Sequence, residues 1–502
     1  GAQLRQAVPI QAWVPLNIHL INLKQGVLTI ASLDELTERQ LNSFLQTVKR
    51  SGFRVDDIAV DLWDRAELMH ALRSVHNTSA DRCAITLSEW LRDIDNGLML
   101  NQFRDDMLAE ALKMRASDIH ILQDNDPEIP NWIKYRIDGD LEPIHLLPHE
   151  AMGRLTTLLK RDAGLNFGDR ISLKDGRFSY SWQGRTIDIR VAAGPHSRDG
   201  EKITMRLLDK AALKNFHEIF APHAEVGNYL LELLSPSMKG GGGFILLSGP
   251  TGSGKTSTLY AAVQEIDRKH RHVLSIEDPI EYEIRYATQW QVNPNVEEGA
   301  EFSDLIRASL RHDPDYIVIG EMRDGETVET ALRASESGHT VISTVHADTA
   351  LQTLERLKSF LPGDKEKAAT YTLSQQINAI LNQRLIRTLC HGCCEKAVAR
   401  DVLEPSVIEA LQLSPDDSIR LRREHGCDLC NRTGYRGRTL LLEALIVKGT
   451  EGDRRALYDA MLRNVNDVPD VSGVQVFSRN ANLSKLVKAG LVDPAYALTM
   501  ME

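Results

Sequence analysis

The stretch Gly249-Pro-Thr-Gly-Ser-Gly-Lys-Thr256 fits the pattern G-x-x-x-x-G-K-[ST] at every fixed position. A short apolar run, Phe244–Ser248, precedes it, and a helical pattern over Ser257–Asp267 follows it. Such a loop cradles phosphates with successive backbone N–H groups, and the N-terminus of the helix adds a favourable dipole. We predict that Lys255 reaches the β- and γ-phosphates of ATP and that Thr256 ligates magnesium. The predicted nucleotide-binding residues are Gly249, Pro250, Thr251, Gly252, Ser253, Gly254, Lys255, Thr256 and Ser257.

Carboxylates stand at the ends of two further apolar runs. Glu277 follows His272–Ile276, and Glu321 follows Asp315–Gly320. Ligands of an open parallel sheet bind at the carboxyl ends of its strands, so both carboxylates are predicted to face the nucleotide. We assign Glu321 to magnesium and water organisation and Glu277 to polarising the attacking water, and the sequence also permits the reverse assignment. Because Gly320 occupies the position of the usual Walker B aspartate, the direct magnesium ligands stay open.

The sequence around the phosphate loop predicts an α/β architecture. From residue 244 to about 388, strands and helices alternate, which favours a parallel sheet covered by helices. Upstream, the predicted strands are 16–23, 26–31 and 54–61, and the predicted helices are 33–51 and 65–75. The predicted divisions are 1–78 (N-terminal α/β domain), 79–103 (linker), 104–215 (second α/β domain), 216–389 (nucleotide-binding domain), 390–434 (tetracysteine subdomain) and 435–502 (helical C-terminal segment).

Four of the six cysteines form two C-x-x-C pairs, Cys390-His-Gly-Cys393 and Cys427-Asp-Leu-Cys430. Tetrahedral zinc joins such loops through four thiolates at about 2.3 Å, and a site filled by four protein ligands is structural. We therefore predict a structural zinc site. The alternative, thioredoxin-like thiol exchange, is less favoured because two such pairs occur in one chain. Cys83 and Cys394 are predicted bystanders outside the zinc site. His391 could replace a ligand, but nothing in the sequence favours it over Cys393.

Composition argues against several classes of function. Lys and Arg number 59 against 70 Asp and Glu, a net charge of −11, so a broad basic surface for nucleic acid is not expected. No apolar run reaches the roughly 18 residues of a membrane-spanning helix, and the N-terminus lacks the features of a secretory signal. We predict a cytoplasmic protein without a transmembrane segment. Because Gly1-Ala2 lacks an initiator Met and suggests a tag remnant, the native start cannot be read from this sequence.

Further motifs follow the phosphate loop in a fixed order. They are Ile276-Glu-Asp-Pro-Ile-Glu-Tyr282, then Leu310-Arg-His-Asp-Pro-Asp315 with Gly320-Glu-Met-Arg-Asp324, then Ser337-Gly-His339 with Ser343-Thr-Val-His-Ala-Asp348. They resemble the Asp box, the Walker B segment and the His box of the secretion ATPase superfamily. Within it, the chain resembles the tetracysteine-containing assembly branch, the motors of type II secretion and type IV pilus assembly. Upstream segments extend the resemblance: Ala116–His120, Arg136–Gly139, Asp175–Arg177, Ile187–Arg190 and Glu201–Leu207.

The resemblance implies a RecA-like P-loop NTPase domain preceded by two smaller α/β domains, with a zinc-binding insertion and a helical C-terminal tail. It implies a closed homohexamer that hydrolyses ATP to drive pilin or pseudopilin assembly through an inner-membrane platform protein. The N-terminal domain would dock on a cytoplasmic-facing membrane assembly protein, which would hold the enzyme peripherally at the cytoplasmic face of the inner membrane. The implied cofactors are ATP, Mg²⁺ and Zn²⁺.

The resemblance also assigns roles to single residues. His339 and His346 are implied in catalysis and in coupling nucleotide state to domain movement, and an imidazole beside a γ-phosphate can sense it by hydrogen bonding. Arg190 and Arg206 are implied to close over the nucleotide, where arginines from another domain or subunit stabilise phosphoryl charge. The implied subunit-interface arginines are Arg307, Arg311, Arg323 and Arg438.

Two alternatives from other classes stay open. A RecA-type nucleic-acid motor would carry basic pore loops and show DNA-stimulated turnover, and the acidic balance argues against it. A nucleotide-gated scaffold would bind without turnover. The sequence does not separate type II secretion from type IV pilus assembly, because both branches share every motif quoted.

Overall fold

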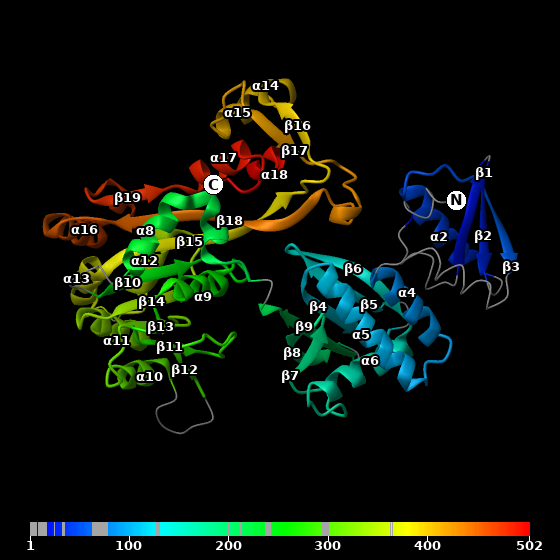
Figure 1. The fold of residues 1–502 in the computed structure, drawn as a ribbon, viewed down its shortest axis with the longest axis horizontal. Coiled ribbons are helices and arrows are strands. Elements are labelled where there is room, and N and C mark those ends of the chain that lie inside the picture. The colour runs from blue at the N-terminus through cyan, green and yellow to red at the C-terminus, as the bar shows by residue number, and fades with distance from the viewer. Residues whose placement is uncertain are drawn as a thin grey trace. The chain divides into compact units, whose positions relative to one another are not determined.

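The computed structural model describes residues 8, 18–24, 26–32, 36–62, 79–126, 131–197, 200–210, 213–235, 242–293, 301–361, 363 and 365–501. The chain divides into two compact units, Gly1–Lys210 and Ala211–Glu502. Figure 1 labels the elements of each unit along the chain.

The first unit begins with a small three-stranded sheet. β1 (Ile18–Lys24) pairs antiparallel with β2 (Val27–Ser32), and β3 (Asp57–Leu62) pairs parallel with β2. The connecting helix α2 (Glu38–Arg50) begins at a capping box, which satisfies two backbone N–H groups at its first turn. These elements confirm the predicted strands and first helix with shifted ends. The predicted helix at 65–75 lies outside the described residues.

Two helices, α4 (Ser79–Trp90) and α5 (Gly97–Lys113), occupy the region predicted as a linker over 79–103, irregular apart from a short helix around 87–94. The helical structure is more extensive than predicted, because Trp90 and neighbouring apolar residues of α4 are buried in the core that α5 shares with the following sheet. The polar residues that indicated a linker lie in α4 itself and in the turn between the helices, where Asn96 caps α5.

A six-stranded antiparallel sheet follows, in the order β6-β5-β4-β9-β8-β7. Alternate residues of β8, Ile187, Ile189 and Val191, are buried in one cluster with α5 and α6, so one face of the sheet carries the core. This sheet confirms the predicted second α/β region. Its elements are β4 (Ala116–Gln123), β5 (Asn131–Ile137), β6 (Asp140–Leu147), α6 (His149–Asp162), β7 (Lys174–Trp182), β8 (Arg185–His196) and β9 (Gly200–Leu208).

The second unit is built on an eight-stranded sheet in the order β12-β11-β13-β14-β10-β15-β18-β19. The strands from β12 to β15 are parallel, which confirms the predicted parallel sheet, and β18 and β19 add to it antiparallel. The parallel strands are β10 (Gly243–Ser248), β11 (Val273–Glu277), β12 (Thr288–Gln291), β13 (Tyr316–Ile319), β14 (Thr340–Val345) and β15 (Ile377–Leu389).

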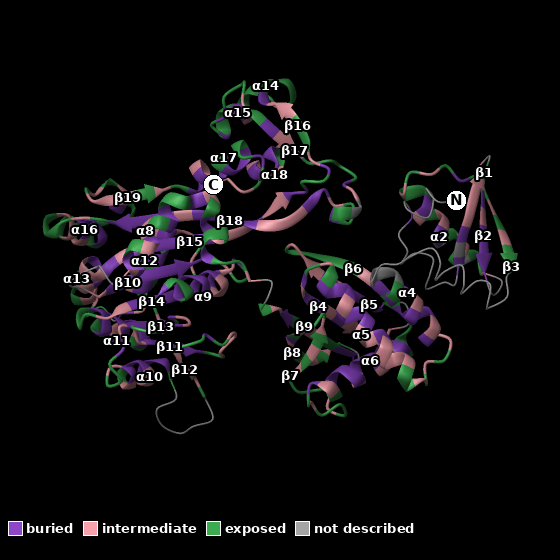
Figure 2. Ribbon diagram, viewed as in Figure 1, coloured by how far each residue is buried: buried purple, intermediate pink, exposed green. Residues whose placement is uncertain are grey.

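Both faces of this sheet are buried (Figure 2). Along β10, Phe244 and Leu246 belong to one core cluster, and Ile245 and Leu247 belong to the other, because successive strand residues point to opposite faces. Burial on both faces explains the continuous apolar run before the phosphate loop. The helices between these strands and before them are α7 (Phe216–Phe220), α8 (Ala224–Leu234), α9 (Lys255–Glu265), α10 (Phe302–Ser309), α11 (Gly325–Glu336), α12 (Ala350–Ser359) and α13 (Glu366–Gln376).

The segment 435–502, predicted to be helical, begins with the long strand β18 (Tyr435–Val447), which corrects that prediction. β18 pairs antiparallel with β15, and its residues Leu441, Leu442 and Ala444 are buried. A strand buried on both faces lacks the alternation that would separate it from a helix in the sequence. The remaining elements of the segment are α16 (Glu451–Arg463), β19 (Val474–Phe477), α17 (Arg479–Lys488) and α18 (Pro494–Leu498).

Residues 390–434, here named the cysteine insertion, leave the sheet after β15 and return to it at β18. Ala399, Ile408 and Ile419 of this insertion share a core with Leu483 of α17 (Figure 1). The insertion and the C-terminal helices therefore pack as one body. The elements of the insertion are β16 (Glu395–Val398), α14 (Ala399–Val402), α15 (Pro405–Ala410) and β17 (Ser418–Leu421).

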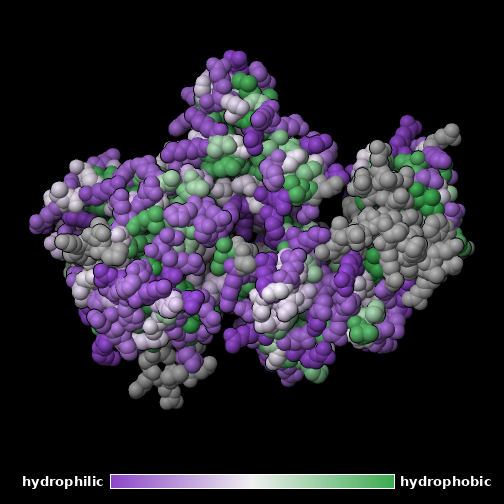
Figure 3. Space-filling model, in the orientation of Figure 1, coloured by the Kyte–Doolittle hydropathy of each residue, from purple (hydrophilic) through white to green (hydrophobic). Residues whose placement is uncertain are grey.

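The face drawn in Figure 3 is mostly hydrophilic, and hydrophobic residues occur on it in small separate areas. Ile171 and Leu173, in the loop before β7, are the most exposed large apolar side chains of the described residues, at 85% each. None of the helices in the described part of the chain has both the length and the apolar character needed to cross a bilayer.

Candidate functional site

The phosphate loop joins β10, inside the eight-stranded sheet, to the first turn of α9. Gly249 has a φ of 144° and Gly254 a φ of 86°, values that residues with side chains rarely adopt. A Cβ on Gly249 would lie 2.3 Å from the carbonyl oxygen of Gln383. Lys255 Nζ donates to the carbonyls of Gly249 at 2.7 Å and Pro250 at 3.0 Å, so the ammonium group lies within the curve of the loop.

The electrostatics of the loop suit an anionic ligand. Lys255 is only 8% exposed, and burial lowers its pKa while the carboxylate of Glu321 opposes that shift. Ser253 Oγ is buried and has no hydrogen-bond partner among the residues that the structure describes. Thr256 and Ser257 continue the first turn of α9, where backbone N–H groups have no partner within the helix. A buried cation, a free hydroxyl and a helix N-terminus therefore meet at one point.

β15 braces the phosphate loop from the neighbouring strand, which sequence reasoning missed. Gln383 Nε2 donates to the carbonyl of Ser253 at 2.9 Å and to Thr258 Oγ1 at 3.2 Å. Asn382 Nδ2 donates to Ser248 Oγ, immediately before the loop, at 3.0 Å. Both amides are buried. No sequence signal pairs β15 with β10, because their register depends on the packing of the whole sheet.

Glu321 follows β13, and His346 follows β14, at the carboxyl edge of the sheet. Glu321 Oε2 accepts from Arg323 Nε at 2.7 Å, and Glu321 Oε1 lies 3.4 Å from His346 Nε2. Arg323 Nη1 also donates to Asp278 Oδ2 at 3.3 Å. Burial lowers the pKa of His346, the charge of Lys255 acts in the same direction, and Glu321 opposes both. Glu321, His346 and Lys255 therefore form one electrostatically linked group.

Glu277 ends β11 at the same edge, but its carboxylate is only 6% exposed and already accepts several hydrogen bonds. Glu277 Oε1 accepts from Ser275 Oγ at 2.7 Å and from Gln289 Nε2 at 3.0 Å, and the hydroxyl of Tyr260 donates to Glu277 Oε2. Burial and the bond to Glu277 raise the pKa of Tyr260, so its hydroxyl stays protonated and donates. Of the two carboxylates between which the sequence left the roles open, Glu321 is the more accessible.

His339 lies away from this group. It immediately precedes β14, whereas His346 follows the strand, so the strand length of about 20 Å separates them. Its Nδ1 donates to the carbonyl of Ala334 at 2.8 Å, and its own carbonyl accepts from the backbone N–H of Gly243. The structure therefore brings His346, and not His339, to the carboxylates and the phosphate loop of this chain.

The predicted arginines are divided between the two units. Arg190 and Arg206 are direct partners across β8 and β9 of the first unit, so their side chains share a face of its sheet. Arg206 Nε donates to Asp118 Oδ1 at 3.0 Å. Arg307 Nη1 pairs with Asp304 Oδ1 at 2.9 Å in the second unit.

The other predicted interface arginines lie at different places in the second unit. Arg311 is exposed just after α10. Arg438 lies on β18, and its carbonyl accepts from Lys214 Nζ at 3.0 Å. Arg323, by contrast, belongs to the carboxylate group of its own chain, where it bonds Glu321. Its predicted place at a subunit contact stays a prediction.

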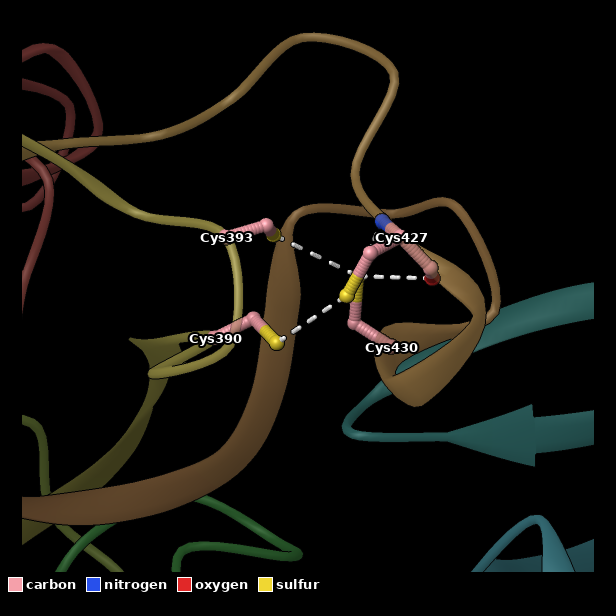
Figure 4. Close-up of side chains that lie close together, drawn as sticks. All are labelled: Cys390, Cys393, Cys427 and Cys430. Carbon is pink, nitrogen blue, oxygen red and sulfur yellow. Dashed lines mark hydrogen bonds between the residues drawn. The ribbon is translucent and has the colours of Figure 1, made fainter.

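The four predicted zinc ligands converge at the end of the β15–β18 pair (Figure 4). The Sγ–Sγ distance is 3.8 Å for Cys390 with Cys427, for Cys393 with Cys430, and for Cys427 with Cys430. A disulfide is about 2.05 Å long, whereas sulfurs at 2.3 Å from a tetrahedral zinc lie about 3.8 Å apart. The four sulfurs therefore have the spacing of zinc ligands.

Backbone donors around Cys430 fit the same site. Cys430 Sγ accepts from the N–H of Cys427 at 3.1 Å and from the N–H of Gly434 at 3.3 Å. Such donors favour a thiolate over a thiol, as a metal ligand requires. Cys394 lies outside the cluster, where its sulfur contacts Arg420 Nη1 at 3.8 Å. The cluster is compatible with zinc.

Cys83, predicted to be a bystander, is buried beside two polar groups of the first unit. Its sulfur lies 3.5 Å from His145 Nε2, and that nitrogen lies 2.5 Å from Glu110 Oε2. Two ligands of one tetrahedral zinc ion would be about 3.3 Å apart, so the nitrogen and the oxygen are at hydrogen-bond rather than co-ligand distance. We interpret this cluster as a buried hydrogen-bond network.

Comparison with known proteins extends these observations. The family described as type II/IV secretion system protein matches residues 94–468. The chain is 37% identical over 375 residues to type II secretion system protein E of Aeromonas hydrophila, covering 74% of this chain and 70% of that protein. It is 36% identical over 351 residues to type IV pilus assembly ATPase PilB of Thermus thermophilus, covering 69% of this chain and 37% of that protein.

A solved structure supports the fold. The ATPase DotB of Legionella pneumophila superimposes with a TM-score of 0.55 at 22% identity, covering 79% of this chain and 95% of that chain. This likeness shows the fold alone, and the predicted RecA-like fold of the second unit agrees with it. The relatives favour a secretion or pilus ATPase over a nucleic-acid motor. With a matching family over most of its length and a complete phosphate loop, the chain belongs to the type II/IV secretion system protein family and is an ATPase.

Proposed function

We propose that this ATPase drives pilin or pseudopilin assembly, in type IV pilus biogenesis or type II secretion. The observation that carries the proposal is the convergence of Lys255, Glu321 and His346 at one sheet edge in a chain whose relatives are secretion and pilus ATPases. Such an edge binds nucleotide and can respond to its γ-phosphate. Hydrolysis at this site would supply the mechanical work.

In the proposed mechanism, the loop amides of residues 249–254 and the ammonium of Lys255 hold the β- and γ-phosphates. Thr256 would hold magnesium, which supplies charge neutralisation at the phosphate oxygens when bound. Glu321, oriented by Arg323, positions the attacking water and accepts its proton. His346 donates a hydrogen bond toward the γ-phosphate and responds to its loss through Glu321.

Glu277 has a supporting role in this proposal. Its three hydrogen-bond donors occupy both carboxylate oxygens and keep them turned into the protein. With both oxygens bonded inside the protein and only 6% of the residue exposed, Glu277 offers an attacking water less access than Glu321 does. We therefore assign water activation to Glu321.

The remaining assignments rest on the family. Arg190 and Arg206 would stabilise phosphoryl charge, and Arg307, Arg311 and Arg438 would line subunit contacts of a homohexamer. The N-terminal sheet would bind a cytoplasmic-facing membrane assembly protein, and the ring would act on an inner-membrane platform protein from the cytoplasmic side. The four-cysteine cluster would hold one structural zinc ion, which ties the base of the cysteine insertion.

The test replaces Glu321 by Gln in the full chain and measures ATP hydrolysis in vitro and pilus or pseudopilus assembly in the cell. We expect both to be lost while nucleotide binding persists. Glu409→Gln, an exposed residue of α15, is the matched control and should leave both unchanged. Assembly that continues without ATP hydrolysis would contradict the motor and favour a nucleotide-gated scaffold.

A further inference from the structure

A buried arginine connects the C-terminal helices to the loop that carries His346. Arg479 is the first residue of α17 and is 3% exposed. Its Nη2 donates to the carbonyl of Asp348 at 2.6 Å, to Asn382 Oδ1 at 3.2 Å and to Glu443 Oε2 at 3.1 Å. One guanidinium nitrogen therefore contacts the His346 loop, β15 and β18.

The partners of Arg479 hold the same loop at further points. Asn382 Nδ2 donates to the carbonyl of Ala347 at 2.9 Å, and Glu443 Oε1 accepts from the N–H of Ala350 at 3.2 Å. The loop from His346 to the start of α12 is thus tied at three positions, directly or through these two side chains. Because Asn382 also bonds Ser248, the same network reaches the strand end before the phosphate loop.

On its other side, α17 belongs to the body formed with the cysteine insertion. Leu483 and Val487 of α17 share a core with Ile408 and Ile419 of the insertion. The backbone N–H of Arg422 in the insertion also donates to Asp493 Oδ2, which caps α18, at 2.8 Å. A displacement of this body would therefore move Arg479, and with it the carbonyl of Asp348.

Stability alone does not explain such an arginine. A buried ion pair is often no more stabilising than apolar side chains of the same volume, whereas it fixes geometry through its directed hydrogen bonds. The planar guanidinium can serve several acceptors in fixed directions, which a lysine cannot reproduce. The acceptors here include the loop next to a proposed γ-phosphate sensor.

We propose that Arg479 is a positioning residue that sets the His346 loop and links its position to the cysteine insertion. The inference rests on the proposed role of His346 in ATP hydrolysis. It predicts that loss of Arg479 slows the chemical step and leaves nucleotide binding intact, because Arg479 holds the His346 loop and its two supporting side chains, whereas Lys255 and the loop amides are assigned to the phosphates.

The test uses the full chain with Arg479→Met, His346→Ala and both together, and measures kcat and KM for ATP. Arg479→Met should lower kcat by about 10- to 100-fold, the range for small misplacements of a reacting group, with KM unchanged within about twofold. In the His346→Ala background, Arg479→Met should lower kcat no further, because substitutions of residues that act as a unit do not have additive effects.

The matched control is Arg454→Met. Arg454 also projects from a C-terminal helix and donates to the carbonyls of Ser374 and Ile377 and to Asn378 Oδ1, but these lie around the start of β15. That is the edge of the sheet opposite the phosphate loop. Arg454→Met should keep kcat within about twofold of the wild-type value, even where it lowers the melting temperature.

The outcomes separate the two proposals. Normal kcat in His346→Ala would contradict the proposed function of His346 and the inference with it. Loss in His346→Ala without loss in Arg479→Met, or losses that multiply in the double variant, would overturn the inference alone. Should Arg479→Met fail to fold, Arg479→Lys keeps the charge without the planar fork. If Arg479→Lys lowers kcat in the wild-type background but lowers it no further in the His346→Ala background, the inference is supported. If Arg479→Lys leaves kcat unchanged, the inference is overturned.

Discussion

Glu321 Oε1 lies 3.4 Å from His346 Nε2, and the two residues follow adjacent parallel strands. β13 and β14 pair from Tyr316 opposite Thr340 to Ile319 opposite Ser343, so the register of the sheet places the two ends side by side. The second carboxylate oxygen of Glu321 is held by Arg323. The carboxylate is therefore oriented from two sides and remains the more accessible of the two candidates.

This orientation predicts different effects for the two carboxylates. Glu321→Gln should lower kcat by at least about 100-fold, as loss of a positioned base does. Glu277→Gln should lower it by less than about tenfold, or 1.4 kcal/mol, since no proton transfer is assigned to Glu277. Steady-state ATP hydrolysis, with binding followed by a fluorescent nucleotide, measures both. An equal loss of kcat in the two variants would contradict the assignment of water activation to Glu321 alone.

The buried network of Glu277 makes a prediction about stability. Tyr260→Phe removes the hydroxyl that donates to Glu277 Oε2 and accepts from the N–H of Tyr282. A buried polar group left without its partner costs about 1–3 kcal/mol, so the free energy of unfolding in urea should fall by that amount. Tyr286→Phe is the control, because Tyr286 is 55% exposed. A change at Tyr260 no larger than at Tyr286 would refute the network.

The sequence predicted those parts of the site that lie on continuous motifs. The phosphate loop, Glu277 and Glu321 each follow an apolar strand, so the edge rule for parallel sheets placed them together. Asn382 and Gln383 were missed, because they reach the loop only through the pairing of β15 with β10. Pairing between strands so distant in sequence is decided by packing of the whole sheet.

Two errors in the fold have a related cause. β18 was taken for helix because burial on both faces removes the alternation of apolar and polar residues. The region of α4 was taken mainly for linker because half of its twelve residues are polar, although Trp90 is fully buried. Such elements are stabilised by tertiary contacts, which a local pattern does not contain.

The sulfur spacing predicts one zinc ion per chain. Cys390→Ser should lower the zinc content of purified protein from about one equivalent to less than half, and should lower the melting temperature, because binding of such a metal contributes to folding. Cys394→Ser, outside the cluster, should retain the metal. Wild-type protein that contains no zinc without prior exposure to chelator would contradict the site.

Two glycines of the phosphate loop predict effects of different size. A Cβ on Gly249 would lie 2.3 Å from the carbonyl oxygen of Gln383, a backbone atom that cannot rotate away, whereas a Cβ on Gly252 would meet nothing within 4 Å. Gly249→Ala should therefore distort the loop and reduce nucleotide affinity by at least about 100-fold, or 2.7 kcal/mol. For Gly252→Ala, the expected cost is only the backbone strain of a side chain at a φ of 78°, about 1–2 kcal/mol. Titration of each variant with a fluorescent ATP analogue measures both affinities. Equal losses would mean that backbone conformation, and not contact with β15, sets the requirement for glycine at position 249.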